Sequence, residues 1–352
     1  MNSQDILFNW FNICIGLNFT SDYRPRRRLR VVICVIHWYQ LSLLLWSFSC
    51  KGDIYCELNY LALGGLFQQP SLFYNAMIFA AYFNITMVST LSLRLESSNC
   101  NHLRTLVGLM RSTNGDQPDQ LYSKLVELVK ISSIGGAIST WVFVIITAYN
   151  GLVTYDTFPL LAFVNLTTYC TFIYWSHATY FAFLYLVYLK LKRHLVTTFH
   201  WIDFDRLIIN HRYQSKLITG INLVLRNYLG YMVVSFCPLL CLQLAAISLE
   251  NQALLTIVVC ISCSTFFGTI LIMVTFLASK LTKLYNQKYK SYSKLIFVSM
   301  TNQKLQLSHV MKVYQKKESL IGFQLFTITQ ITRFTFFKLM LLILRYSLLS
   351  FK

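Results

Sequence analysis

Long uncharged apolar runs recur along most of the chain, separated by polar segments. A hydrocarbon core of about 30 Å needs about 20 apolar helical residues, and six runs come close to or exceed that length without a charged side chain. A seventh run contains Lys338 and Arg345. The pattern predicts a single all-α membrane domain over 1–352, with seven spans at about 31–49, 71–93, 131–149, 158–189, 228–249, 253–278 and 334–350.

The segments between the spans also carry helical patterns. After the sixth span, apolar residues recur at helical spacing, as at Leu281, Leu284, Leu305 and Val313. This spacing predicts cytoplasmic anchor helices over about 279–333 that pack together below the membrane. The alternative for the basic stretch 280–294 is an amphipathic helix lying on the anionic leaflet. In the third span, Gly135 and Gly136 would permit close contact with a neighbouring helix.

Composition agrees with a membrane protein. The chain is 55% hydrophobic, has a mean hydropathy of +0.51 and contains only 12% charged residues. Soluble domains carry about 25% charged residues, so this composition argues against a water-soluble enzyme and excludes a disordered chain. The formal net charge is +18. In so apolar a chain, that excess is typical of loops that face anionic lipid.

The distribution of Lys and Arg predicts the orientation. The N-terminal segment and the loops after spans two, four and six, the last counted to residue 319, hold 26 of these residues, whereas the loops after spans one, three and five hold 1. The positive-inside rule therefore places the N-terminus in the cytoplasm and the C-terminus outside the cell. G-protein-coupled receptors have the opposite orientation. A cleaved leader at residues 6–20 is the weaker alternative, because that segment lacks a basic start.

The sequence contains no motif typical of an enzyme. It has no Gly-rich phosphate loop, no His-Glu-x-x-His and no nucleophilic Ser elbow. We therefore expect no enzymatic activity, no cofactor, no metal and no nucleic-acid partner. His37 and His177 lie within spans, where a polar side chain faces the interior of the bundle. The first six spans lack Asp and Glu, which disfavours an ion-coupled transporter.

Two kinds of covalent modification depend on the orientation. Cys50 and Cys56 lie in the first outside loop, where they form either a disulfide or two free thiols. Asn-x-Ser/Thr sites occur at Asn18, Asn84 and Asn165. The first is predicted to be cytoplasmic and the other two lie within spans, so we expect none of them to be glycosylated.

The C-terminal segment carries a pattern that resembles the motif of a known family. Gly322 and Phe323 are followed by Ile331 and Arg333, and then by an apolar helix that reaches Tyr346. Together with the inside N-terminus and long cytoplasmic loops, this resembles the arthropod gustatory/odorant chemoreceptor superfamily, and the gustatory branch most closely. The family has Thr-Tyr at the end of the apolar run and then Gln-Phe, whereas this chain has Arg345 before its Tyr and Lys352 in place of the Gln.

The resemblance implies a gustatory-type receptor subunit in the plasma membrane of sensory neurons. Such a subunit would form a homotetramer or heterotetramer with other chemoreceptor subunits, surrounded by membrane lipid. A small organic tastant would open a non-selective cation channel lined by the seventh helix. The alternatives are an odorant-receptor-type subunit of the same superfamily, a metabotropic G-protein-coupled receptor, or a transporter or structural membrane protein.

One face of the seventh span fits a pore. At 100° per residue, a set of apolar and hydroxyl side chains falls opposite Lys338 and Arg345. These candidate pore-lining residues are Phe336, Met340, Ile343, Ser347 and Ser350. Small polar and apolar side chains suit a channel wall, although an ordinary packed helix explains the same pattern. We expect Lys338 and Arg345 to extend toward water or carbonyl groups rather than toward the pore axis.

The outward halves of spans two, three, four and six are the predicted location of a ligand site. Aromatic side chains with a few polar groups suit a small organic molecule. The candidate ligand-binding residues are Tyr74, Met77, Trp141, Tyr149, Phe163, Tyr169 and Ile257. Ordinary core packing is the alternative at each position, because 16% of the chain is aromatic.

Overall fold

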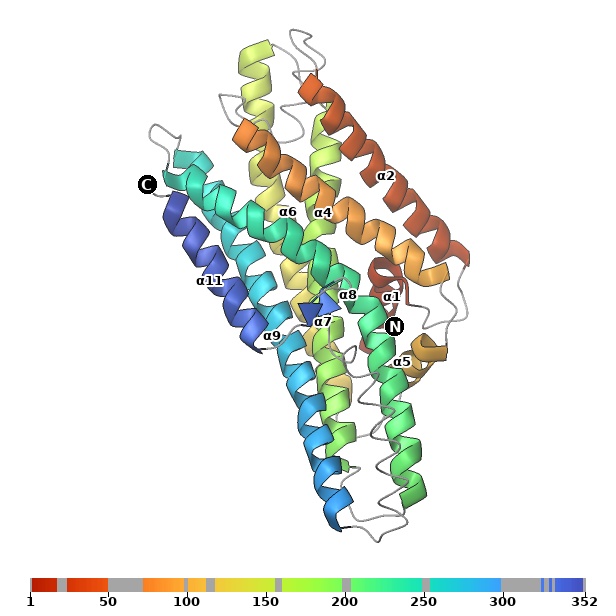
Figure 1. Ribbon diagram of the computed structural model, residues 1–352. Helices are drawn as coiled ribbons and strands as arrows, with labels where there is room; N and C mark the ends of the chain where they lie inside the picture. Colours follow the sequence, from red (N-terminus) through yellow and green to blue (C-terminus); the bar gives the residue numbers. More distant parts are fainter. Residues whose placement is uncertain are drawn as a thin grey trace.

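A computed structural model of the full chain gives the arrangement of its helices (Figure 1). The residues that it describes are 2–17, 24–49, 72–97, 101–111, 118–155, 160–197, 204–248, 254–298, 324–325, 329–330 and 333–350. Within these ranges the chain is helical except for two very short strands. The helical architecture predicted from the sequence is therefore confirmed.

Each of the seven predicted spans lies almost entirely within a separate helix. In chain order these helices are α2 (Arg24–Ser49), α4 (Leu72–Ser97), α6 (Pro118–Tyr155), α7 (Leu160–Thr197), α8 (Phe204–Ser248), α9 (Leu254–Val298) and α11 (Arg333–Ser350). Among the described residues, three segments are long and apolar enough to cross a membrane: Arg27–Trp46, Thr219–Leu244 and Ser264–Leu284. The count of seven spans and the orientation stay predictions.

Several helices are longer than a bilayer requires. At 1.5 Å per residue, the 38 residues of α7 extend about 57 Å and the 45 residues of α8 about 67 Å. A hydrocarbon core accounts for about 30 Å of this length. Helices α6 and α9 are of similar length, with 38 and 45 residues. The ends of these helices therefore continue beyond the apolar segments, as the helical spacing in the polar loops predicts.

Two helices precede or interrupt the spans. Helix α1 (Ser3–Ile15) begins after the N-cap Asn2 and ends at Gly16, and α5 (Asn101–Arg111) is a short amphipathic helix between α4 and α6. The sequence pattern does not single out either as a separate helix. Helix α1 is buried along one side, where the side chains of Leu7, Phe11 and Ile15 are inaccessible to solvent, and Asp5 is exposed.

At the start of the segment 279–333, where cytoplasmic anchor helices are predicted, the chain is helical, and the position of this helix below the membrane stays a prediction. Helix α9 continues to Val298, whereas residues 299–323 lie outside the described residues. Beyond them the prediction is wrong, because β1 (Gln324–Leu325) and β2 (Thr329–Gln330) pair as antiparallel strands. The segment 327–332 is rich in β-branched Thr and Ile, which favour strands over helices. Strand β1 packs against α8.

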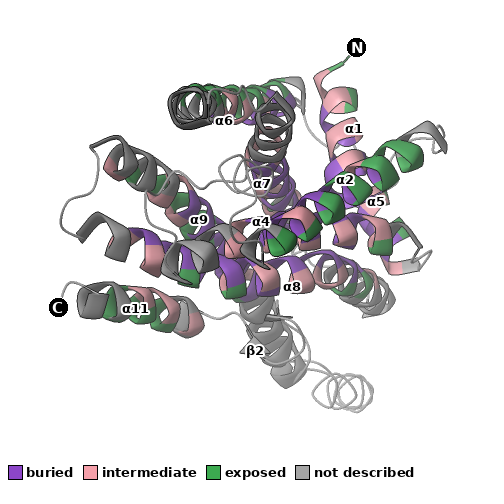
Figure 2. Ribbon diagram, turned by 90° about the horizontal axis from the view of Figure 1, so that it is seen from above, coloured by how far each residue is buried: buried purple, intermediate pink, exposed green. Residues whose placement is uncertain are grey.

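The helices form an elongated bundle around one apolar core (Figures 1 and 2). Helix α6 packs mainly on α7, α2 on α4, and α8 lies between α4 and α9. Helix α11 packs along the outside of α8 and α9, at the edge of the bundle in Figure 2. Apolar side chains are exposed on the outer faces of α2, α6, α9 and α11, as lipid contact would require.

Two glycines allow helices to approach closely. A Cβ added at Gly136 would lie 2.3 Å from the ring of Tyr174, so the absence of a side chain lets α6 approach α7. A Cβ at Gly220 would lie 2.5 Å from the backbone oxygen of His102, so α5 rests on the backbone of α8. The predicted close contact is therefore confirmed at Gly136. At Gly135 an added Cβ would meet no atom within 4 Å.

Candidate functional site

Four uncharged polar side chains join three helices in the middle of the bundle. We define the central cluster as Asn84 of α4, His177 of α7, and Tyr228 and Ser235 of α8; each is at most 2% exposed. The His177 ring lies 2.9 Å from the Tyr228 hydroxyl through Nδ1 and 3.0 Å from Asn84 Oδ1 through Nε2. Asn84 Nδ2 lies 2.6 Å from Ser235 Oγ.

The partners fix the direction of each hydrogen bond. Asn84 Oδ1 can only accept, so His177 Nε2 carries the proton and donates to it. His177 Nδ1 then accepts from the Tyr228 hydroxyl. Asn84 Nδ2 donates to Ser235 Oγ, whose own proton goes to the backbone oxygen of Tyr231. With a neutral imidazole, the cluster is therefore a chain of four hydrogen bonds.

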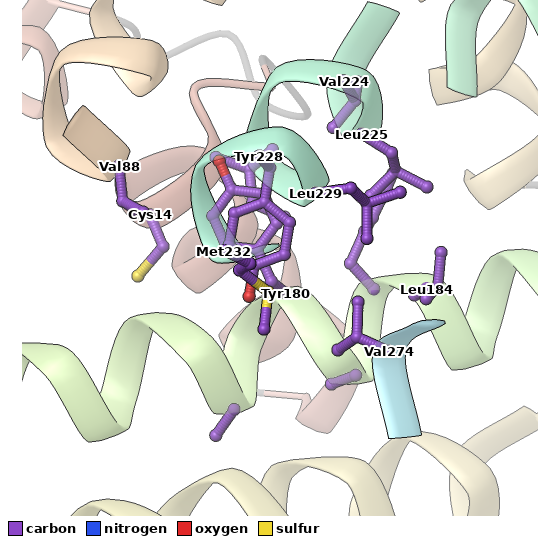
Figure 3. Close-up of a cluster of buried hydrophobic side chains, with 14 of the residues drawn as sticks. Cys14, Val88, Tyr180, Leu184, Val224, Leu225, Tyr228, Leu229, Met232 and Val274 are labelled. Carbon is purple, nitrogen blue, oxygen red and sulfur yellow. The ribbon is translucent and has the colours of Figure 1, made fainter. Parts of the chain in front are cut away.

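Aromatic rings enclose this cluster. The rings of Tyr180 and Tyr228 stack in parallel, with centroids 3.7 Å apart and an interplanar angle of 3° (Figure 3). The Phe236 ring meets the His177 ring edge to face at 5.0 Å. Such packing keeps water away from the polar groups and strengthens their hydrogen bonds. It also fixes the rotation of α7 relative to α8.

The side chains of the central cluster are suited to holding helices in place rather than to catalysis. It contains no carboxylate or thiol, and the one imidazole already uses both of its nitrogens. Among the residues that the structure describes, no group of three or more His, Cys, Asp or Glu side chains could hold a metal ion. What the cluster can do is hold α4, α7 and α8 in one relative arrangement, because any slip would leave buried polar groups without partners.

A second polar junction lies at the end of α5. The backbone oxygen of Met110 accepts a hydrogen bond from Lys190 Nζ of α7 at 3.0 Å and from the Tyr122 hydroxyl of α6 at 3.3 Å. A cation near the C-terminal end of a helix is favourable for the helix dipole. Burial raises the pKa of Tyr122 to about 12, so its phenol stays protonated and continues to donate at physiological pH. This junction connects α5 with α6 and α7.

The two histidines predicted to face the interior do so. His177 is fully buried in the central cluster, and His37 of α2 is 3% exposed, with its ring centroid 4.8 Å from that of Phe172. Asn84, at one of the Asn-x-Ser/Thr sites, is also fully buried. The sequence reasoning missed Asn84, Tyr228 and Ser235 as partners. Uncharged polar residues within apolar runs were the available signal, but their spacing does not indicate which helices will meet.

The predicted ligand-binding residues fall on α4, α6, α7 and α9. Trp141 is 47% exposed on an outer apolar face of α6 that also includes Ile138 and Ile145. Ile257 of α9 is half-buried. The side chains of the other five lie outside the described residues: Tyr74, Met77, Tyr149, Phe163 and Tyr169. The structure brings none of the described members into the central cluster, and a role in ligand binding stays a prediction.

The described part of the predicted pore face turns toward its own bundle. Ile343 is half-buried against the core, and Met340 is half-buried beside it on α11. Phe337 and Leu341 lie on the other side of α11 and are 61% and 64% exposed. Lys338 and Arg345 are also exposed. The side chains of the remaining candidates lie outside the described residues: Phe336, Ser347 and Ser350.

The remaining predicted positions are located only in part. Arg333 begins α11 and Tyr346 lies on it. Gly322, Phe323 and Ile331 of the C-terminal motif lie outside the described residues, as do Cys50 and Cys56. Comparison with protein-family models gives no match to this chain, and comparison with curated proteins gives none either. The family therefore stays a prediction that depends on the resemblance described above.

Proposed function

We propose that this chain is a gustatory-type chemoreceptor subunit that forms a ligand-gated, non-selective cation channel. In this proposal seven helices cross the plasma membrane of a sensory neuron, with the N-terminus inside and the C-terminus outside. Four subunits, identical or with related partners, surround a pore along α11. A small organic tastant binds each subunit among its other helices.

The observation that carries the proposal is the match between the seven apolar runs and seven separate helices. Their outer faces expose large apolar side chains, such as Val35 of α2, Ile138 of α6 and Ile272 of α9. A water-soluble bundle would place charged residues at such positions. The asymmetry of Lys and Arg favours the inside N-terminus, which excludes the orientation of G-protein-coupled receptors.

The position of α11 supports an assembly around it. Among the described residues, this helix packs on α8 and α9 along one side, and its other side exposes Phe337, Leu341 and Leu344. Copies of α11 from neighbouring subunits are suitable occupants for that side. In such an assembly the exposed side would lie nearer to the pore axis than the predicted face around Ile343. We therefore include both faces in the test of the pore.

The central cluster supplies a route from ligand to pore in this proposal. Its four residues connect α4 and α7 with α8, and α8 is in direct contact with α11. A ligand that shifts α4 or α7 would have to move α8 or break buried hydrogen bonds. A small shift of one helix can therefore cause a discrete rearrangement of the next, because a closely packed interior has few stable arrangements of its helices.

The test is an electrical recording from cells that express the full chain, with G-protein signalling blocked. Sugars, polyols and plant alkaloids are applied in turn as probes. We expect at least one class to evoke a current that is absent from cells without the protein. Its reversal potential will become more negative when external sodium is replaced by a large impermeant cation, and it will not follow chloride.

Two matched cysteine variants locate the pore. Cysteine at Leu341 or at Ile343 is exposed to a charged thiol reagent during the evoked current. Block at one of these positions and not at the other identifies the face of α11 that lines the pore. Lys338→Gln tests the same choice by charge: it changes the current–voltage relation if the exposed side lines the pore, and leaves the reversal potential unchanged if the face around Ile343 does. A reversal potential that follows chloride, or an evoked response that disappears with G-protein block, would refute the proposal.

A further inference from the structure

The N-terminal helix α1 packs between two helix pairs, and we call this position its seat. It contacts α2 and α4, which pack on each other, and α6 and α7, which also pack on each other. The Phe8 ring meets the Tyr122 ring of α6 at 6.0 Å, and the Phe11 ring meets the Phe183 ring of α7 at 5.4 Å. All four helices therefore contact α1 along its buried side.

Three specific contacts fix that end of α1. Gly16 has a φ of +85°, and a Cβ added there would lie 2.0 Å from the backbone oxygen of Ser92 on α4. Arg30 of α2, which is 1% exposed, donates from Nη1 to the backbone oxygen of Asn12 at 2.5 Å and to its Oδ1 at 2.6 Å. Because this backbone oxygen is in the last turn of α1, the guanidinium is favoured by the helix dipole.

The same end of α1 contacts α7 next to the tyrosine stack beside the central cluster. The Cys14 thiol hydrogen-bonds the Thr179 side chain of α7, and Thr179 precedes Tyr180. Figure 3 shows Cys14 and Val88 beside the stacked rings of Tyr180 and Tyr228. Tyr228 donates to His177 within the central cluster. A continuous path of buried contacts therefore runs from α1 through α7 to α8.

The balance of forces makes α1 displaceable. Helix α1 is buried along one side only, and Ile6, Trp10 and Ile13 are half-buried. The seat is therefore held by packing along that one side and by the contacts at Gly16, Asn12 and Arg30. A change at these few contacts would move α1 while leaving the larger helix pairs intact.

We propose that α1 is a conformational switch of the bundle: seated, it holds α8 against α7 through the Tyr180–Tyr228 stack, and unseated, it releases α8. The switch goes beyond the proposed channel, because it concerns the mobility of α8 whether or not the chain conducts ions. In this switch Gly16, Asn12 and Arg30 act as positioning residues: they hold α1 in place and so affect the central cluster without belonging to that cluster.

The experiment is hydrogen–deuterium exchange on the full chain in lipid nanodiscs, with Gly16→Ala and Arg30→Met compared with the wild type. Unseating is measured by labelling of Cys14 with N-ethylmaleimide, located by mass spectrometry. Burial raises the pKa of this thiol well above its ordinary value, so the seated helix protects it. We expect Cys14 labelling at least tenfold faster in both variants, and exchange at 228–235 at least tenfold faster.

The control is Gly108→Ala on α5, where an added Cβ meets no atom within 4 Å. It should leave both rates unchanged, and exchange in the buried part of α9 should stay slow in every variant. Faster Cys14 labelling with unchanged exchange at 228–235 would overturn the switch, since α1 would then leave without releasing α8. Unchanged labelling in both variants would overturn the seat itself. A protein that conducts no ions but gives the expected exchange would refute only the channel.

Discussion

Replacement of His177 by leucine will lower the free energy of unfolding by about 2–6 kcal/mol. The leucine fills much of the space of the ring but leaves two buried groups without partners, the Tyr228 hydroxyl and Asn84 Oδ1. Each buried polar group without a partner lowers the free energy of unfolding by about 1–3 kcal/mol. This cost is larger than the net contribution of the lost hydrogen bond to stability. Unfolding of the purified protein by SDS, followed by circular dichroism, measures the loss.

The matched control is the triple variant Asn84→Leu, His177→Leu and Tyr228→Phe. It removes all three polar partners together, and Ser235 keeps its bond to the backbone oxygen of Tyr231. We expect the triple variant to be more stable than His177→Leu alone, because no buried donor or acceptor is left over. Losses that simply add from the single variants would show that these residues do not act as one network.

Adjacent glycines in α6 will respond to alanine with opposite signs. Gly136→Ala will destabilise the protein by about 1–3 kcal/mol, because the added methyl group overlaps the ring of Tyr174. That ring cannot move freely, since its centroid lies 3.9 Å from that of Phe266 on α9. Gly135→Ala will stabilise the protein by up to about 1 kcal/mol, because an interior glycine weakens a helix and its added methyl group meets no atom within 4 Å.

The same SDS titration compares the two glycine variants. Both substitutions add one methyl group to the same turn of the same helix, so intrinsic helix propensity cancels between them. The difference therefore reports only the contact between α6 and α7. Equal effects of the two variants would show that α6 does not approach α7 through Gly136 as described.

Much of the fold follows from the sequence because a membrane helix has a simple signature. An uncharged run of the right length must satisfy its backbone groups internally, and this makes it helical. The runs at 71–93 and 158–189 accordingly lie in α4 and α7. Interior positions such as His177 were also predictable, since a polar side chain avoids lipid.

The rest could not be predicted from local pattern. The apolar residues that form α1 do not predict a separate helix that packs on the bundle, and the weaker alternative there is a leader at residues 6–20. Only the contacts of α1 with four other helices reveal how it packs. The strands β1 and β2 contain two residues each, too few for any periodicity. The central cluster depends on which of several polar residues in separate spans come together, and Asn84 is 93 residues from His177 in sequence.

The central claim is that an odd number of helices crosses the membrane with the N-terminus inside. A reporter tag fused at Met1, and in a second protein at Lys352, tests it in intact cells with an impermeant antibody. The account predicts that the tag at Lys352 is stained on intact cells, whereas the tag at Met1 is stained only after permeabilisation. Staining of the Met1 tag on intact cells would contradict the orientation, and with it the proposed receptor channel.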